Sequence, residues 1–162
     1  MSNKIEQAQQ WLNQVLPQMG CETSVAISET EDEYTESKWL LMDKTKLNPE
    51  QLQVFLEQDA KALNHLQYLM NITINVDVEP DEKEVFTIDL DDYRLNHRQE
   101  LFARATQVAE QVRTTGEEIT MEPMSGIDRR QVHHFFAKID DLTTESRGYE
   151  HDRRLVVKPV AA

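Results

Sequence analysis

The sequence has one cysteine, only four glycines and no long apolar run, and each scarcity excludes a class of protein. Cys21 alone cannot form an intramolecular disulfide, so the chain suits a reducing compartment rather than a disulfide-stabilised secreted fold. No run approaches the roughly 20 apolar residues of a membrane-spanning helix, and residues 1–6 lack the apolar core of a signal peptide. The glycines do not cluster, which excludes a glycine-rich phosphate loop. We therefore expect a cytoplasmic protein.

Basic residues are scarce, and the shortage is confined to the front of the chain. The sequence holds 17 Lys+Arg against 30 Asp+Glu, a net charge of −13. Residues 1–93 contain 6 basic and 19 acidic residues, whereas residues 94–162 contain 11 of each. The front half should repel a polyanion such as nucleic acid. The neutral back half leaves room for a local basic face.

Apolar periodicity in the front half predicts a small α+β domain with the element order αββααβ. We expect a helix over residues 5–19, a helix beginning at Pro49 and a helix over residues 61–71. The expected strands are residues 24–27, 39–42 and 85–90. On the third helix, the apolar residues expected to face the core are Leu63, Leu66, Leu69 and Met70.

The back half predicts a second α+β domain with the order αβαββ. The expected helices are residues 96–114 and a shorter one capped by Ser125, and the expected strands are residues 119–121, 142–144 and 155–157. Each half would form a small sheet covered by helices. The charge balance changes near residues 91–95, where we place the boundary between the domains.

The segment Ser125–His133 carries the candidate site. Arg129 and His133 are four residues apart, so a helix places both side chains on one face. Arg129 offers a planar, permanently charged fork that suits a phosphate. His133 offers a ring that can stack on a base or hydrogen-bond to a phosphate. Taken alone, the same residues also fit a surface helix whose arginine pairs with a carboxylate and whose histidine packs on a sheet.

A wider pattern resembles a known family. Five segments occur in the same order as in bacterial Jag-type proteins: Leu63–Asn71, Asp89–Arg94, Met121–Met124, Asp128–Arg130 and Arg153–Pro159. These proteins join a type II KH domain to a domain named after its Arg-x-x-x-His motif, which Arg129 and His133 fill here. The resemblance implies a type II KH-like domain over residues 1–92 and an Arg-x-x-x-His domain over residues 93–162.

The resemblance also implies a function, namely binding of single-stranded RNA without enzymatic activity or a cofactor, with single-stranded DNA left open as a ligand. It further implies post-transcriptional regulation linked to cell elongation and division, with a small single-KH protein as a partner. The residues that we expect to contact nucleic acid are Arg129, His133, Arg130, Arg154, Arg153 and Lys158. In a strand, Arg153 and Arg154 point to opposite faces, so at most one of them shares a face with Lys158.

Two departures from the family pattern bear on this function. The Gly-x-x-Gly loop with which KH domains hold nucleic-acid backbone is replaced by Glu57-Gln58-Asp59-Ala60. Two carboxylates in that loop should oppose a phosphate, so we do not transfer the KH binding site to this chain. Asp152 stands where the family usually has an aromatic residue, which removes a stacking surface beside Arg153 and Arg154.

Three other interpretations were weighed on the residues. The first is an interaction scaffold that docks through the acidic KH-like domain and has little RNA affinity. The second is an enzyme acting on nucleotides, for which no catalytic constellation is visible. The third is a metal site at His133-His134 with Asp140-Asp141, which is disfavoured because adjacent residues on a helix diverge by about 100°. Asp89, Asp91 and Asp92 are interpreted as a solvated acidic turn without calcium-loop spacing.

Overall fold

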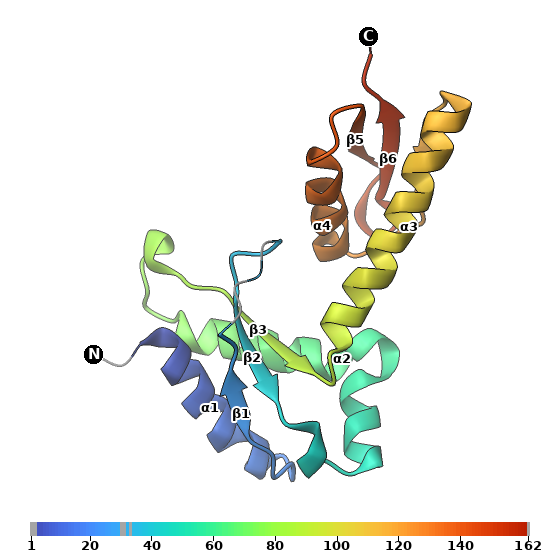
Figure 1. Cartoon of the computed structure of the whole chain (residues 1–162). Coiled ribbons are helices and arrows are strands. Elements are labelled where there is room, and N and C mark those ends of the chain that lie inside the picture. Colours follow the sequence, from blue (N-terminus) through green and yellow to red (C-terminus); the bar gives the residue numbers. More distant parts are fainter. Residues whose placement is uncertain (1–2, 30–31, 33, 162) are drawn as a thin grey trace. The chain divides into compact units, whose positions relative to one another are not determined.

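The chain forms two compact α+β units, each built on a three-stranded sheet (Figure 1). The computed structural model describes residues 3–29, 32 and 34–161. The units are Met1–Arg94, here the front unit, and Leu95–Ala162, the back unit. The division falls two residues after the predicted boundary. No helix of the described residues is long and apolar enough to cross a bilayer.

In the front unit, two helices pack on one sheet. The elements are α1 (Lys4–Gln18), β1 (Val25–Ile27), β2 (Lys38–Met42), the short 3-10 helix η1 (Lys44–Lys46), α2 (Pro49–Ile74), η2 (Pro80–Glu82) and β3 (Phe86–Leu90). Strand β2 is central, antiparallel to β1 and parallel to β3. The core lies between the helices and the sheet, where Leu12 and Leu63 pack with Leu40, Phe86 and Ile88. The expected element order is observed.

Helix α2 is interrupted at Glu57–Ala60, between the two helices that the sequence predicts. Glu57 is extended, and Gln58, Asp59 and Ala60 follow with φ values of 52°, 59° and 56°. These values lie in the left-handed region, which costs roughly 1–2 kcal/mol per residue without glycine. The Asn64 side chain supports the turn by donating to the Asp59 carbonyl at 3.2 Å. The loop thus takes a glycine-like backbone without any glycine.

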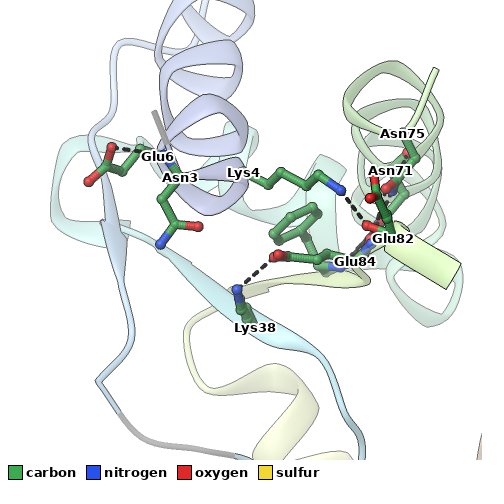
Figure 2. Close-up of polar contacts among 9 residues, drawn as sticks. Asn3, Lys4, Glu6, Lys38, Asn71, Asn75, Glu82 and Glu84 are labelled. Atoms are coloured by element: carbon green, nitrogen blue, oxygen red, sulfur yellow. Dashed lines mark hydrogen bonds and ion pairs between the residues drawn. The ribbon is translucent and has the colours of Figure 1, made fainter. Parts of the chain in front are cut away.

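The second half of α2 is attached to β3 by side-chain amides one helical turn apart, here called the amide ladder (Figure 2, which shows two of the three). Four helical residues rise about 6 Å, and two strand residues rise about 6.6 Å. Every fourth helical amide therefore meets every second residue of the strand. Asn75 bonds the backbone N–H and carbonyl of Glu84 at 3.1 and 2.8 Å, Asn71 bonds those of Phe86 at 2.9 and 2.7 Å, and Gln67 accepts from the Ile88 N–H at 2.8 Å.

The core face of α2 differs from the prediction at one residue. Leu63, Leu66 and Met70 are buried as expected, but Leu69 is exposed. The prediction for Leu69 is wrong because each helical residue turns by about 100°, which places Leu69 well away from the line that Leu63, Leu66 and Met70 share.

The back unit has the same design with different connections. Its elements are α3 (Tyr93–Thr115), whose first two residues belong to the front unit, β4 (Ile119–Thr120), α4 (Gly126–Ala137), β5 (Leu142–Arg147), η3 (Glu150–Asp152) and β6 (Arg154–Pro159). Strand β6 is central and antiparallel to both neighbours. Helices α3 and α4 share one core with the sheet, in which Ala105 and Val112 pack with Phe136 and Leu155. The rings of Phe102 and Phe135, 5.0 Å apart, join the two helices.

Candidate nucleic-acid interface

The candidate site begins at the N-terminus of α4, which is capped by Ser125. The Ser125 hydroxyl accepts from the backbone N–H of Asp128 at 3.1 Å. The Asp128 carboxylate contacts Nε2 of His97 on α3 at 3.0 Å. The cap leaves the positive end of the α4 dipole at the start of the segment that carries Arg129 and His133.

Arg129 is held by backbone carbonyls. Its Nη1 donates to the carbonyl of Met124 at 3.2 Å and lies 3.5 Å from that of Arg153, which directly precedes β6. The guanidinium also lies beside Gly126, where an added Cβ would meet Nη2 at 3.6 Å. No carboxylate of a described residue pairs with Arg129, so the structure does not support the interpretation of a surface arginine in an ordinary ion pair.

His133 is exposed, and one of its ring nitrogens is held in place. Nδ1 lies 2.5 Å from the hydroxyl oxygen of Thr144 on β5. Nε2 forms no hydrogen bond with a described residue. Sequence reasoning missed Thr144, although strand alternation was an available signal. Thr144 and Leu142 lie on the same face of β5, and Leu142 belongs to the core.

Two further predicted contacts are exposed cations near this site. Arg130 is the next residue of α4, turned about 100° from Arg129 towards solvent. Arg153 is exposed, and its carbonyl is the one that Arg129 approaches. Within the described part of the chain, neither Arg130 nor Arg153 forms an ion pair. The structure therefore brings together Arg129, His133 and the backbone of Arg153, with the charges of Arg130 and Arg153 available.

The other two predicted contacts, Arg154 and Lys158, lie on the opposite face of the sheet. They alternate with Leu155 and Val157, which face the core and the helices. Both are paired: Arg154 Nη2 with Asp152 at 2.9 Å, and Lys158 Nζ with Glu145 at 2.7 Å. The six predicted residues thus do not form one surface.

That outer face is a network in which acids accompany the bases. Arg147 bonds Glu145 and also Glu118, the latter at 2.6 Å. Hydrogen bonds from Lys158 and Arg147 lower the pKa of Glu145, and the bond from Arg147 lowers the pKa of Glu118. Both carboxylates stay ionised at neutral pH, so they compete with any phosphate for these cations.

The histidines and aspartates that were considered for metal binding do not converge. Among the described residues, no group of three or more His, Cys, Asp or Glu side chains is placed to hold a metal ion. Asp141, one member of the considered set, is bound by Arg113 through Nε and Nη2 at 2.7 and 2.8 Å.

Residues 99–159, which include the site, match the family model of the Arg-x-x-x-His domain. Over 154 residues, 94% of this chain, the sequence is 25% identical to the RNA-binding protein KhpB of Clostridium symbiosum and covers 64% of that protein. It is 27% identical over 110 residues to the RNA-binding protein KhpB of Bacillus subtilis (strain 168), which is 67% of this chain and 52% of that protein.

A third relative, the RNA-binding protein KhpB of Lactiplantibacillus plantarum, is 28% identical over 104 residues, which is 64% of this chain and 32% of that protein. The chain therefore spans less than two thirds of the length of these relatives. The family match covers the motif at Arg129 and His133 and supports the resemblance to Jag-type proteins in the back unit. The KH assignment of the front unit stays a prediction.

Proposed function

We propose that this protein binds single-stranded RNA, without catalysing a reaction, through the α4 side of its back unit. The observation that carries the proposal is the fixed pair at Arg129 and His133: Arg129 is held by two backbone carbonyls and His133 by Thr144. The family match over residues 99–159 and the three relatives printed as RNA-binding proteins support the same function.

The geometry suggests a division of labour between the two side chains. Nη1 of Arg129 is occupied by carbonyls, which orients the fork and leaves Nε and Nη2 for a phosphate. The N-terminus of α4 adds its partial positive charge. His133, with Nδ1 held by Thr144, presents Nε2 and the ring face to a base or a neighbouring phosphate. Arg130 and Arg153 add charge without a carboxylate to compete.

The proposal excludes Arg154 and Lys158 from the primary contact. Both lie on the other sheet face and are engaged by Asp152 and Glu145. If Arg129, Arg130 and Arg153 each meet one phosphate, log K should fall with log salt at a slope of about −2. We expect modest affinity, lost steeply as salt rises.

Under the same proposal, the front unit is a type II KH-like domain that does not hold RNA through Glu57–Ala60. The element order αββααβ supports the KH-like assignment, and Glu57 and Asp59, both exposed, support the loss of the loop's phosphate contact. The Jag resemblance adds a cytoplasmic role in post-transcriptional regulation linked to cell elongation and division.

The test is fluorescence anisotropy with a labelled pool of single-stranded RNA at low and physiological salt. His133→Ala and Arg129→Gln should each weaken binding by about tenfold, and the double variant should bind with a shallower salt slope. Arg113→Gln is the matched control, because Arg113 contacts Asp141 next to the end of β5 that pairs with Pro159, away from Arg153. Unchanged binding by the double variant, with its fold confirmed by circular dichroism, would contradict the proposal.

A second pair of variants tests whether His133 must be held. Thr144→Val removes the hydroxyl that contacts Nδ1 while keeping the shape, so we expect RNA binding to weaken several-fold. Thr143→Val is the control, because Thr143 is paired with Lys158 and lies on the opposite face of β5. Equal affinities for the two variants would show that the position of the His133 ring does not matter.

A further inference from the structure

The second half of α2 has three faces, and only two are used within the front unit. One face packs into the core through Leu63, Leu66 and Met70. A second face is the amide ladder on β3. The third face points away from both because of the 100° turn between successive helical residues. It belongs to no interaction that stabilises the unit.

This third face is apolar. Tyr68 is 65% exposed, Leu69 55%, Ile72 49% and Val76, just after the helix, 62%. We call these four residues the outward strip. Leu69, Ile72 and Val76 follow the spacing i, i+3, i+7, with which one helix packs against another. Single exposed apolar residues are ordinary, but a contiguous strip along one helix face is typical of an interaction site.

Charge around the outward strip indicates what covers it. Residues 1–94 carry 7 Lys+Arg and 19 Asp+Glu, a net of −12. The segment that directly follows the strip, residues 77–84, holds five acids and one lysine. Lys38 neutralises one of them, Glu84, at 2.6 Å, and Lys4 bonds the backbone carbonyl of Glu82 rather than its carboxylate (Figure 2).

The remaining acids of this segment are exposed and form no ion pair within the described part of the chain: Asp77, Glu79, Asp81 and Glu82. A second copy of this chain would bring two such acidic surfaces together, which like-charge repulsion opposes. A partner with basic residues beside its apolar face would instead gain from the same charges.

We propose that the outward strip of α2 docks a basic amphipathic helix of a protein partner. Its apolar residues, repeated every three to four positions, would pack on Leu69, Ile72 and Val76, and its flanking lysines or arginines would meet the acids that follow the strip. The surface lies in the front unit and takes a protein, so it is independent of the RNA-binding proposal for the back unit.

The test uses the intact chain and a labelled 18-residue peptide of leucine and lysine with its leucines at helical spacing. A peptide of the same composition in scrambled order is the control for charge alone. We expect the amphipathic peptide to bind at least tenfold more tightly than the scrambled one. The double variant Leu69→Ser, Ile72→Ser should lose at least tenfold in affinity for the amphipathic peptide.

Val85→Ser is the matched variant, because Val85 is equally exposed, at 59%, but lies outside α2. It should bind as the natural chain does. Equal binding of the two peptides, or equal loss in both variants, would overturn the proposal. So would sedimentation that shows a concentration-dependent dimer abolished by Leu69→Ser, Ile72→Ser, because a second copy would then be the occupant.

Discussion

Asp89, at the end of β3, is a buried carboxylate whose two oxygens differ in their surroundings. Oδ1 accepts from the backbone N–H groups of Leu90 and Arg94, at 2.9 and 3.0 Å, and so helps to start α3. Oδ2 is buried without a hydrogen-bond partner among the described residues. Burial raises the pKa of Asp89, and the two backbone N–H groups oppose the rise only in part. Ionisation of this residue therefore costs stability.

The Asp89→Asn variant tests this cost. Because the pKa is higher in the folded than in the unfolded chain, the natural protein loses stability as pH rises through the unfolded value near 4 to the folded value. The variant does not titrate there, so its stability relative to the natural chain should improve between about pH 3 and pH 7. Urea unfolding at both pH values measures it. A relative stability that is independent of pH, or that falls with pH, would contradict the assignment.

For the site, residue-level prediction succeeded where the contact is local and failed where it is distant in sequence. The i, i+4 spacing placed Arg129 and His133 on one helix, and α4 has that helix. The partners that hold them, Thr144 and the carbonyl of Arg153, are 11 and 24 residues away. Spacing along a helix carries no information about which strand packs beside it, so these partners required the tertiary structure.

Among the elements, α2 shows why apolar periodicity is an incomplete guide. The predicted helices and their break at Glu57–Ala60 are observed, because Asn48 caps the first turn and Pro49 suits it. The sequence contains more apolar residues than the core accepts, and periodicity alone assigned Leu69 to the core. The polar face was equally hidden, since nothing local indicates that Gln67, Asn71 and Asn75 bond a strand.

The Asn71→Ala variant tests the amide ladder. The change leaves the backbone N–H and carbonyl of Phe86 without the side-chain partners that they have at 2.9 and 2.7 Å. We expect the front unit to lose about 1–3 kcal/mol of stability. Thr73→Ala is the control, because the Thr73 hydroxyl bonds only the Leu69 carbonyl of its own helix. It should change stability by less than about 0.5 kcal/mol.

Both unfolding curves can be followed by tryptophan fluorescence. The chain has two tryptophans, Trp11 and Trp39, and both lie in the front unit. The signal therefore reports the front unit without interference from the back unit. Similar losses in Asn71→Ala and Thr73→Ala would show that the ladder adds nothing beyond helix propensity.

At the scale of the whole molecule, charge and the candidate RNA site are segregated. The front unit carries nearly the whole net charge, and the back unit carries the site at Arg129 and His133. Composition alone predicted this division, because it depends only on counting. At about 0.01 M salt the Debye length is roughly 30 Å, so the acidic unit should slow the approach of RNA to the back unit.

Neutralising four exposed acids of the front unit tests this effect. The combined change Asp77→Asn, Glu79→Gln, Asp81→Asn and Glu82→Gln takes the net charge from −13 to −9. We expect several-fold faster RNA association at about 0.01 M salt and little difference at 0.15 M, where screening is strong. Stopped-flow fluorescence measures the rates. An unchanged rate at low salt would show that RNA does not sense the front unit.

The amide ladder has one more consequence, for the solubility of the folded chain. Strand β3 ends the front sheet on one side, and an unpaired outer strand is a template on which another chain can add a strand. Here the backbone groups of Glu84, Phe86 and Ile88 that such a strand would need are already bonded by α2. Domain swapping and amyloid-like growth are therefore blocked along β3 for as long as α2 stays in place.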